Sequence, residues 1–532
     1  MFTTAMGTTF EAYNFILYGS LAPLFSRHFF SALNETAAFV FTLLTFAAGY
    51  LVRPLGALVF GSLGDRKGRK RAFLMTITLM GLATFSIGLL PSYESVGLLA
   101  PALLIALRLL QGLAFGGEYG GAVVYAGEHA PAGQRGLYCG WLQVAGGAGL
   151  FLSFLVVYLV RRSLGEAAFD QWGWRLPFLF SIVLMAVSLR YRLHLEETPA
   201  FRRMDAMQRT ARRPVGEIFG DWRNLRLMLV ILLGLMVPQG VIFYTAVFYA
   251  QFFLIRILQL PQATMTFIML VVTLISLPFY MLWSWWSDSV GRKPLLLTGA
   301  ALSMILMVPV FQGLGHAVNP ALATASITAP VLVTSDSQEC SWQFDPVEQA
   351  AFASSCDIAK SALTLMGVSY RNAEGSPGTL AVVQVGTSTI QSVDGRALGP
   401  VGLAVAQRDF QERLSALLTK EGYVLAPDPA RANLLLVTVL LLLLVLPATM
   451  VYALGPLMAF ELIPTRIRYT GLSLPFHIGS GWFGGFLPAI AFAMAAANGN
   501  PYFGLWYPLV ATVLGVAVLL FLIPETRGRP LS

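Results

Sequence analysis

The chain has 532 residues, of which 56% are hydrophobic and only 12% are charged, with a mean hydropathy of +0.68. Soluble domains carry about 25% charged residues, so this composition excludes a globular enzyme with one membrane anchor and indicates a protein that crosses the membrane many times. The net charge of +8 does not predict a nucleic-acid partner, because the cations cluster in short loops between apolar segments, as orientation in a membrane requires.

Twelve segments are apolar over the roughly 20 residues that a spanning helix needs. Glu11 interrupts the first of them and no basic region precedes it, so we expect a retained helix and not a signal peptide. The expected helices are centred near Leu17, Phe46, Met80, Leu104, Leu150 and Leu184 in the first half, and near Ile242, Val272, Met304, Leu442, Gly479 and Val513 in the second.

The loop from Gly61 to Arg71 carries five cations, which predicts that it lies in the cytoplasm. Alternation of the helices then places both termini and the basic connector, which begins near Arg202, on the same side. Arg161 and Arg162 are the exception, because they fall on the outer face. There they could extend toward lipid headgroups.

Three motifs recur in the same order in both halves, which predicts two six-helix halves related by a parallel repeat. The pairs are Gly61-x-x-x-Asp65-x-x-Gly68-Arg69-Lys70 with Ser284-x-x-x-Asp288-x-x-Gly291-Arg292-Lys293, Glu128-x-x-Pro131-x-x-x-Arg135 with Glu461-x-x-Pro464-x-x-x-Arg468, and Glu197-Thr198 with Glu525-Thr526.

The repeats also predict an insertion, because Asp65 precedes Glu128 by 63 residues whereas Asp288 precedes Glu461 by 173. The surplus of 110 residues must lie between helices nine and ten, in a loop that alternation places outside. Its composition is that of a soluble domain, with helices expected over Ala350 to Met366 and Asp409 to Glu421 and a strand over Thr379 to Val385, and its length suffices for a small core.

The insertion contains two of the three cysteines, Cys340 and Cys356. An oxidising compartment favours a disulfide between them, and two free thiols are the alternative.

The expected fold is therefore an all-α polytopic membrane protein with twelve transmembrane helices and a small α+β extracytoplasmic insertion. The predicted parts are an N-terminal six-helix half (1–195), a cytoplasmic connector (196–225), helices seven to nine (226–317), a soluble periplasmic insertion (318–431), and helices ten to twelve with a cytoplasmic tail (432–532).

The loop between helices two and three resembles the signature of the major facilitator superfamily, and the chain is more narrowly similar to metabolite:proton symporters. The matching stretches are Phe10-Glu11-Ala12-Tyr13-Asn14-Phe15, Arg53-Pro54-Leu55-Gly56, Arg108-Leu109-Leu110-Gln111-Gly112, Gly116-Gly117-Glu118-Tyr119-Gly120-Gly121, Glu197-Thr198-Pro199 and Glu461-Leu462-Ile463-Pro464-Thr465-Arg466. Members of that family carry α-ketoglutarate, citrate, shikimate, or proline and betaine. The chain departs from the family at Asn14, where an aspartate is usual, and in the large insertion.

Ionisable side chains inside a membrane are costly and mark functional sites by default. Arg108 and Gln111 share a helix face, and Arg108 could bind a carboxylate substrate or form a structural salt bridge to an acid such as Glu11. Glu118 stands among four glycines, whose close packing could remove water from its carboxyl group. Because Asn14 cannot titrate, Glu11 and Glu118 are the leading candidates for a proton site.

Three other residues carry a functional and a structural interpretation. Arg53 could line the substrate path or hold the contact between helices two and eleven. His477 could titrate near neutral pH if accessible, although a buried histidine bonded to a neighbour is commoner. Tyr13 could contact substrate or simply pack.

The charged loops predict a cytoplasmic gate in which Asp65 lies near Arg69 and Glu128 lies near Arg135. Asp288, Arg292, Glu461 and Arg468 repeat these positions in the second half. Breaking such a network as the halves rock apart would switch access between the two sides.

We expect a monomeric inner-membrane transporter of bacteria that takes up a small polar metabolite with protons, by alternating access. An organic acid is favoured by the intramembrane arginines. The alternatives are a zwitterionic osmolyte, uncoupled facilitation or export, and, in a different class, a membrane sensor that uses the outer domain. No nucleotide-binding, metal-binding or catalytic pattern stands out, so we expect no cofactor, no metal and no enzymatic activity.

Overall fold

The computed structural model describes residues 2–31, 42, 45, 48–131, 133–194, 196–207, 213–341, 352–425 and 432–531. Within these ranges, ten helical segments are long and apolar enough to cross a membrane, and each contains one of the predicted centres. Of the two other predicted centres, Leu17 lies in helix α1 (Phe2–Ser20). Phe46 falls outside the described residues, a few positions before helix α4 (Arg53–Lys67).

The N-terminal half is a bundle of long helices. After α1, its elements are α2 (Ala22–Phe29), α4 (Arg53–Lys67), α5 (Arg69–Gly88), α6 (Tyr93–Val96), α7 (Leu99–His129), α8 (Arg135–Leu164), α9 (Glu166–Ala168), η1 (Phe169–Gly173) and α10 (Arg175–Leu193). Two short helices follow in the connector, α11 (Pro199–Ala206) and α12 (Pro214–Phe219).

The C-terminal half repeats this plan but contains more π-helical turns, which are frequent at functional sites. Its membrane elements are α13 (Trp222–Ile231), η2 (Leu232–Met236), α14 (Val237–Tyr244), η3 (Thr245–Tyr249), α15 (Ala250–Phe252), η4 (Phe253–Ile257), α16 (Gln262–Val290), α17 (Arg292–Val318), α21 (Leu434–Leu462), η6 (Thr465–Ile467), α22 (Arg468–Phe476), η7 (His477–Gly484), α23 (Leu487–Asn498), η8 (Phe503–Leu505) and α24 (Trp506–Leu522).

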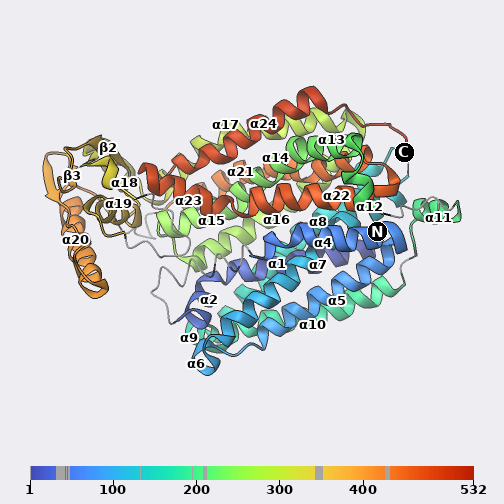
Figure 1. The fold of residues 1–532 in the computed structure, drawn as a ribbon, viewed down its shortest axis with the longest axis horizontal. Coiled ribbons are helices and arrows are strands. Elements are labelled where there is room, and N and C mark those ends of the chain that lie inside the picture. The colour runs from blue at the N-terminus through green and yellow to red at the C-terminus, as the bar shows by residue number, and fades with distance from the viewer. Residues whose placement is uncertain are drawn as a thin grey trace.

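The two halves lie side by side, and both termini lie at one end of the bundle, near α11 and α12 (Figure 1). The same sharp turn joins α4 to α5 and α16 to α17. Its central residue is Gly68 (φ 104°) in one half and Gly291 (φ 111°) in the other. Residues with a side chain rarely adopt this conformation, which explains why a glycine recurs here in the sequence.

Helix α7 packs closely against α4 and α22 through the glycines around Glu118. A Cβ atom on Gly116 would lie 2.1 Å from the carbonyl oxygen of Arg53 in α4, and one on Gly120 would lie 2.1 Å from Oγ of Ser473 in α22. Small residues allow such close approach of helix backbones in membranes. The expected dense packing around Glu118 is therefore present.

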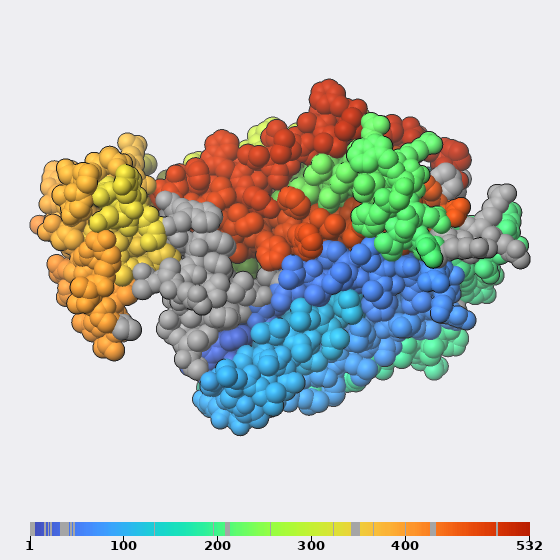
Figure 2. All heavy atoms as spheres, viewed as in Figure 1, coloured from blue at the N-terminus to red at the C-terminus, as the bar shows by residue number. Residues whose placement is uncertain are grey.

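The insertion forms a separate lobe at the end of the bundle opposite the termini (Figure 2). It contains α18 (Pro320–Thr328), β1 (Val331–Ser335), η5 (Ser337–Glu339), α19 (Ser355–Leu365), β2 (Tyr370–Glu374), β3 (Val382–Val385), β4 (Ser388–Gln391) and α20 (Pro400–Lys420). The sheet order is β2-β1-β3-β4, with β1 and β2 parallel and the other pairs antiparallel. The side chains buried between sheet and helices include Val333, Val383, Leu363 and Phe410.

The expected elements of the insertion differ from the structure in extent and in number. Helix α19 begins at Ser355, where the hydroxyl of Ser354 accepts a hydrogen bond from Asp357 N and caps the helix. The expected strand is confined to β3, and α20 begins nine residues before Asp409, at Pro400. Strands β1, β2 and β4 were not predicted, because runs of four or five residues carry too little alternation to identify.

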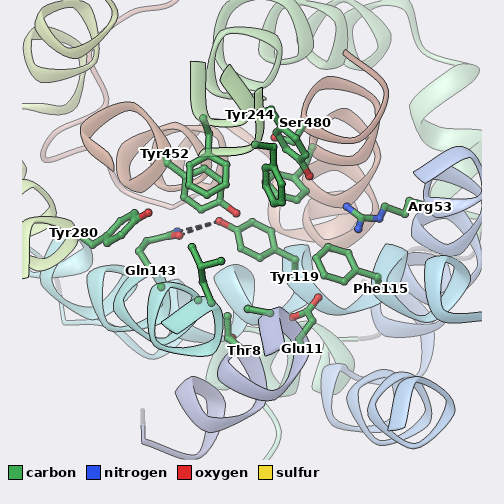
Figure 3. A pocket seen from close by; sticks show the side chains of 17 residues that line it. Thr8, Glu11, Arg53, Phe115, Tyr119, Gln143, Tyr244, Tyr280, Tyr452 and Ser480 are labelled. Carbon is green, nitrogen blue, oxygen red and sulfur yellow. Dashed lines mark hydrogen bonds between the residues drawn. The ribbon is translucent and has the colours of Figure 1, made fainter. Parts of the chain in front are cut away.

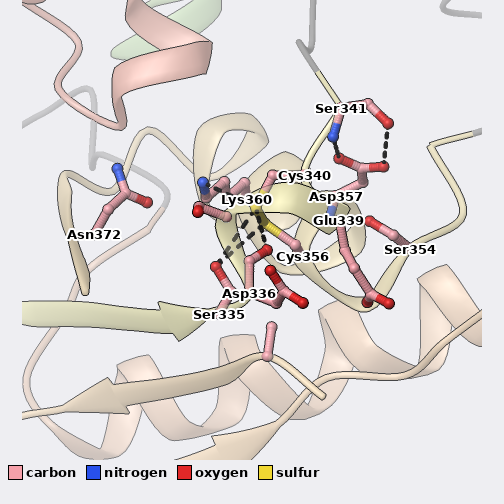
Figure 4. The surroundings of a disulfide bond; sticks show 12 residues. Ser335, Asp336, Glu339, Cys340, Ser341, Ser354, Cys356, Asp357, Lys360 and Asn372 are labelled. Carbon is pink, nitrogen blue, oxygen red and sulfur yellow. Dashed lines mark hydrogen bonds between the residues drawn. A yellow bond between two sulfur atoms is a disulfide. The ribbon is translucent and has the colours of Figure 1, made fainter. Parts of the chain in front are cut away.

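A disulfide joins Cys340, after η5, to Cys356 in the first turn of α19, with 5.3 Å between the Cα atoms (Figure 4). The carboxylate of Asp357 accepts hydrogen bonds from the backbone N–H and the hydroxyl of Ser341, both at 2.8 Å. These two links fasten the segment after η5 to the start of α19.

The insertion is attached to the C-terminal half through its ends and through β2. Where it leaves and re-enters the bundle, Asn433 N donates to Ala317 O at 2.9 Å, so the two ends are adjacent. At β2, Tyr370 N donates to Gly499 O at 2.9 Å, just beyond the end of α23. Adjacent ends are what a domain inserted into a loop requires.

Candidate functional site

A cavity of about 70 Å³ lies at the middle of the bundle, between the two halves (Figure 3). Its polar lining comes from both halves and includes one acid, one cation and four tyrosines. The polar residues are Thr8, Glu11, Arg53, Tyr119, Gln143, Tyr244, Tyr280, Tyr452 and Ser480. Because helices of both halves supply the lining, a rigid-body movement of one half against the other changes the cavity.

Arg53 is the cation of this cavity and is fully buried. Its guanidinium group lies between two aromatic rings, 4.1 Å from the ring centre of Tyr50 and 3.9 Å from that of Phe115. These two cation–π contacts restrain the guanidinium group, and a restrained arginine presents its N–H donors in a rigid fork. Both predicted roles of Arg53 are thus compatible with its position, since it also lies close to Gly481 of η7.

Glu11 and Glu118 face a common void between α1, α5 and α7 that is too small to hold a water molecule. Glu118 forms an ion pair with Arg192 of α10 and accepts a hydrogen bond from the hydroxyl of Thr76. The carboxylate of Glu11 is buried and has no hydrogen-bond partner within the described part of the chain, but it interacts electrostatically with Glu118, Arg192 and Arg53. The two acids therefore share the field of Arg192, and Arg53 also acts on Glu11.

Arg108 and Gln111 share a helix face, as predicted, since Arg108 donates to Oε1 of Gln111 at 2.8 Å. Gln111 in turn donates to Thr84 of α5 at 2.7 Å, and the guanidinium group of Arg108 lies 4.3 Å from the ring centre of Tyr18 in α1. Neither residue is among those that line the central cavity. In this conformation the pair joins three helices of the N-terminal half.

Three further predicted residues are buried beside the cavity without lining it. Tyr13 donates to the carbonyl oxygen of Pro177 at 2.7 Å and so binds α1 to α10. Neither amide atom of Asn14 has a hydrogen-bond partner among the residues that the structure describes. His477 lies with its ring centre 5.7 Å from that of Phe115 and 5.0 Å from that of Phe476.

The gate cluster comprises the eight loop charges predicted to close one end of the bundle, and the structure brings all eight together at the end that carries the termini. Its first part is centred on Asp65, whose carboxylate accepts hydrogen bonds from Tyr469 N at 3.2 Å and Thr470 N at 2.9 Å. Asp65 also lies 3.2 Å from Arg69. An acid in the last turn of α4, in the N-terminal half, thus caps the first turn of α22 in the C-terminal half, where a helix N-terminus favours a negative charge.

The second part repeats this arrangement in the opposite direction. Asp288 of the C-terminal half accepts hydrogen bonds from Gly136 N and Leu137 N, both at 2.9 Å, in the first turn of α8. It lies 2.9 Å from Arg292, which is four residues later in the sequence. Each half therefore holds a helix of the other half by the same contact.

Glu128 and Arg135 do not pair, contrary to the prediction. Glu128 lies 3.7 Å from Arg69 and 3.3 Å from Arg468, whereas Arg135 lies 3.7 Å from Glu461. Helix α7 ends at His129 and the chain reverses before α8 begins. Glu128 therefore pairs with Arg468 and Glu461 pairs with Arg135, so each acid contacts an arginine of the other half rather than the arginine that follows it by seven residues.

The third repeated motif, Glu-Thr, binds the gate cluster in each half. Thr198 donates to Glu128 at 2.7 Å and Thr526 donates to Glu461 at 2.6 Å. Glu525 accepts hydrogen bonds from Arg292 N and Lys293 N, across the glycine turn. Burial raises the pKa of Glu525, but these and two further backbone donors hold that pKa below its usual value.

Several residues of the site were missed in the sequence. Arg192 stands beside Arg190 in the last turn of α10, where a cation is also expected from membrane orientation. The cavity residues Tyr119, Gln143, Tyr280, Tyr452 and Ser480 lie in apolar segments, where aromatic and small polar side chains are common. Gln143 and Leu150 both line the cavity, and their spacing of seven residues places them on the same face of α8. This spacing is the one feature of the sequence that could have identified the cavity-lining face of α8.

Comparisons with known proteins agree with this architecture. A family model described as "Sugar (and other) transporter" matches residues 1–220. The shikimate transporter of Escherichia coli K12 is 36% identical over 309 residues, which cover 58% of this chain and 70% of that protein. The proline/betaine transporter of the same strain is 33% identical over 317 residues, covering 58% and 63%. In structure, the proton:xylose symporter XylE of Escherichia coli matches with a TM-score of 0.62 at 17% identity, covering 100% of this chain and 96% of that one.

Proposed function

The chain belongs to the major facilitator superfamily of transporters, and on this basis we propose that it takes up a small polar metabolite together with protons, by alternating access. The relatives named above are transporters and not enzymes. The observation that carries the proposal is the combination of a central cavity lined by both halves with a gate cluster that closes one end of the bundle. A site reached from one side at a time is what alternating access requires.

The proton site that we propose is the group of Glu11, Glu118 and Arg192. Glu11 lines the central cavity, and it faces the same void as Glu118. Arg192 pairs directly with Glu118, whereas Glu11 makes no hydrogen bond to any residue that the structure describes, so ionising both acids leaves a buried carboxylate without a direct partner in the membrane interior. The arrangement favours one bound proton on the pair, and movement of Arg192 relative to Glu11 would change its affinity.

An organic acid is the cargo that the cavity fits best. Among the described residues that line it, Arg53 is the only arginine or lysine, and its guanidinium group can bind a carboxylate with two hydrogen bonds. Hydroxyl groups of Tyr119, Tyr244 and Ser480 add neutral donors around it. A carboxylate would therefore find one fixed positive charge and several donors.

A zwitterionic osmolyte is the second candidate, and a specific feature of the lining favours it. Phe115, Tyr244, Phe248 and Tyr452 surround the cavity with aromatic faces, which bind quaternary ammonium groups. Glu11 supplies a negative charge opposite Arg53. A betaine would use both charges, whereas a dicarboxylate would use Arg53 and require Glu11 to be protonated.

We further propose that the protein lies in the inner membrane with both termini in the cytoplasm and with the insertion outside. The common end of the termini and the opposite position of the insertion (Figure 1) support this orientation. The basic loops support it independently, because the gate cluster and its neighbouring lysines are at the end that the positive-inside rule assigns to the cytoplasm.

Uptake into proteoliposomes is expected to depend on the pH gradient and on Glu11. Labelled shikimate-like acids and proline-like zwitterions should be tested with and without a protonophore, in the original protein and in Glu11→Gln. The protonophore should abolish accumulation, and Glu11→Gln should retain exchange of bound substrate while losing accumulation, because a glutamine cannot carry a proton. Uptake that is indifferent to the pH gradient and that stops when the concentrations inside and outside are equal would instead identify an uncoupled facilitator.

Removal of the insertion is expected to leave transport intact. Since Ala317 and Asn433 are hydrogen-bonded neighbours, a short Gly-Ser linker can replace residues 320–431 without straining the bundle. The shortened protein should keep its uptake rate within about twofold and should still bind substrate in a thermal-shift assay. Loss of uptake together with a signalling defect in cells, in a variant that remains folded, would support the sensor alternative.

A further inference from the structure

Two adjacent arginines, Arg161 and Arg162, stand in the last turn of α8, at the end of the bundle opposite the gate cluster. Cations are unusual at the outer end of a spanning helix, and the transport mechanism proposed above does not use them. Arg161 is held in place, since it lies 3.3 Å from Glu166 and 4.6 Å from the ring centre of Phe169. Arg162 is exposed and makes no ion pair with any residue that the structure describes.

The arginines stand at the rim of a cavity of about 330 Å³ between α8 and α16. Glu166, which pairs with Arg161, and Gln262 also line the cavity. The other walls are mainly apolar, with Phe154, Val157 and Tyr158 from α8 and Ala263 and Thr266 from the start of α16. The cavity is thus amphipathic, with positive charge at the membrane surface and apolar side chains toward the membrane interior.

The cavity lies beyond the positions where α8 and α16 pack most closely, and beside it Tyr158 still contacts Phe267 of α16, with ring centres 6.5 Å apart. Near the gate cluster the two helices pack closely, since a Cβ atom on Gly136 would lie 2.2 Å from the carbonyl oxygen of Ser284. Midway they still touch, with a Cβ atom on Gly147 only 2.6 Å from Leu277 Cδ2. The cavity lies along α8 between Phe154 and Arg162.

We propose that this cavity binds an anionic phospholipid of the outer leaflet, with the phosphate at Arg161 and Arg162 and an acyl chain along Phe154 and Val157. A small polar metabolite would gain little from the apolar walls, whereas an amphiphile matches both parts. Since α8 and α16 belong to different halves, the lipid occupies the space between the halves at the outer end. It therefore stabilises the conformation in which the gate cluster is closed.

The test uses native mass spectrometry and thermal unfolding of the full chain in phosphatidylglycerol, in phosphatidylcholine, and in detergent with inorganic phosphate. Phosphatidylglycerol should remain bound and raise the unfolding temperature, whereas the other two should not. Arg162→Gln should weaken phosphatidylglycerol binding by about fivefold. The double variant Arg161→Gln with Arg162→Gln should weaken it by about 25-fold. Arg371→Gln is the control, because Arg371 is an exposed arginine of the insertion that does not line this cavity.

A second variant tests the apolar part without touching the charges. Ala263 is exposed and lines the cavity, so Ala263→Trp should fill the space of the acyl chain and lower phosphatidylglycerol binding in a folded protein. Equal lipid binding by the original protein and by both variants would overturn the proposal. Stabilisation by inorganic phosphate that is equal to that by phosphatidylglycerol, and that Arg162→Gln abolishes, would instead identify a site for soluble anions.

Discussion

Replacing Arg192 with glutamine is expected to abolish uptake and to lower the free energy of unfolding by about 3–5 kcal/mol, the usual cost of leaving one member of a buried ion pair uncompensated. Arg192 and Glu118 have side chains only 1% and 4% exposed, so water cannot replace the lost partner. Glu11 loses the same counter-charge, because it faces the void that Glu118 lines. Chemical unfolding in detergent and uptake into proteoliposomes measure the two effects.

The double variant Glu118→Gln with Arg192→Gln separates stability from coupling. Removing both members of the pair leaves no uncompensated charge, so most of the lost stability should return. Uptake driven by the pH gradient should stay absent, because Glu11 then lacks the acid and the arginine with which it is proposed to share a proton. If the double variant transports as well as the original protein, the ion pair is only structural and the proposed proton site is wrong.

A lysine at position 192 provides the matched control. Lysine keeps the positive charge but lacks the planar group of arginine. The backbone of Gly7 lies so close to the guanidinium group of Arg192 that a Cβ atom on Gly7 would overlap it, so the absence of a side chain at Gly7 leaves room for a cation at position 192. We expect Arg192→Lys to fold and to retain part of the uptake. A lysine variant that is as unstable as the glutamine variant would show that shape, and not charge, holds α10 against α7.

The spanning helices and the gate cluster could be predicted because each leaves a signal along the chain. A spanning helix requires a long apolar run whatever its neighbours are, and the gate charges recur at one spacing in two halves. Partners across the bundle leave no such signal. The distance between Glu128 and Arg135 in the sequence is short, yet Glu128 pairs with Arg468, 340 residues away, because the two halves cap one another's helices.

The central cavity was harder to predict for a related reason. Tyr119 and Tyr452 come from different halves and stand among other aromatic residues, with ring centres 6.4 Å apart. Nothing in either apolar segment distinguishes an aromatic side chain that faces a cavity from one that faces lipid. Arg53 was found because a charge inside a membrane segment is costly, whereas Arg192 was hidden in a helix end where cations are common.

Replacing Asp288 with asparagine is expected to open the end of the bundle that carries the gate cluster and to reduce uptake at least tenfold. The asparagine loses the ion pair with Arg292 and binds the first turn of α8 less strongly, since a neutral acceptor at a helix N-terminus is weaker than a carboxylate. A contact that couples two sites typically changes the equilibrium constant between two conformations by roughly 5- to 150-fold. The closed state should therefore lose much of its population.

Cys139 provides a built-in measure of this opening. Of the three cysteines, it is the one outside the disulfide, and it lies 1% exposed in the second turn of α8, beside the gate cluster. Its rate of labelling by a small maleimide should rise about tenfold in Asp288→Asn, and Cys139→Ser should show no labelling. Asp65→Asn is the matched variant, because Asp65 holds α22 and not α8. If the two contacts form one gate, both variants must expose Cys139, whereas exposure in Asp288→Asn alone would show that only the end of α8 has loosened and that the halves do not move together.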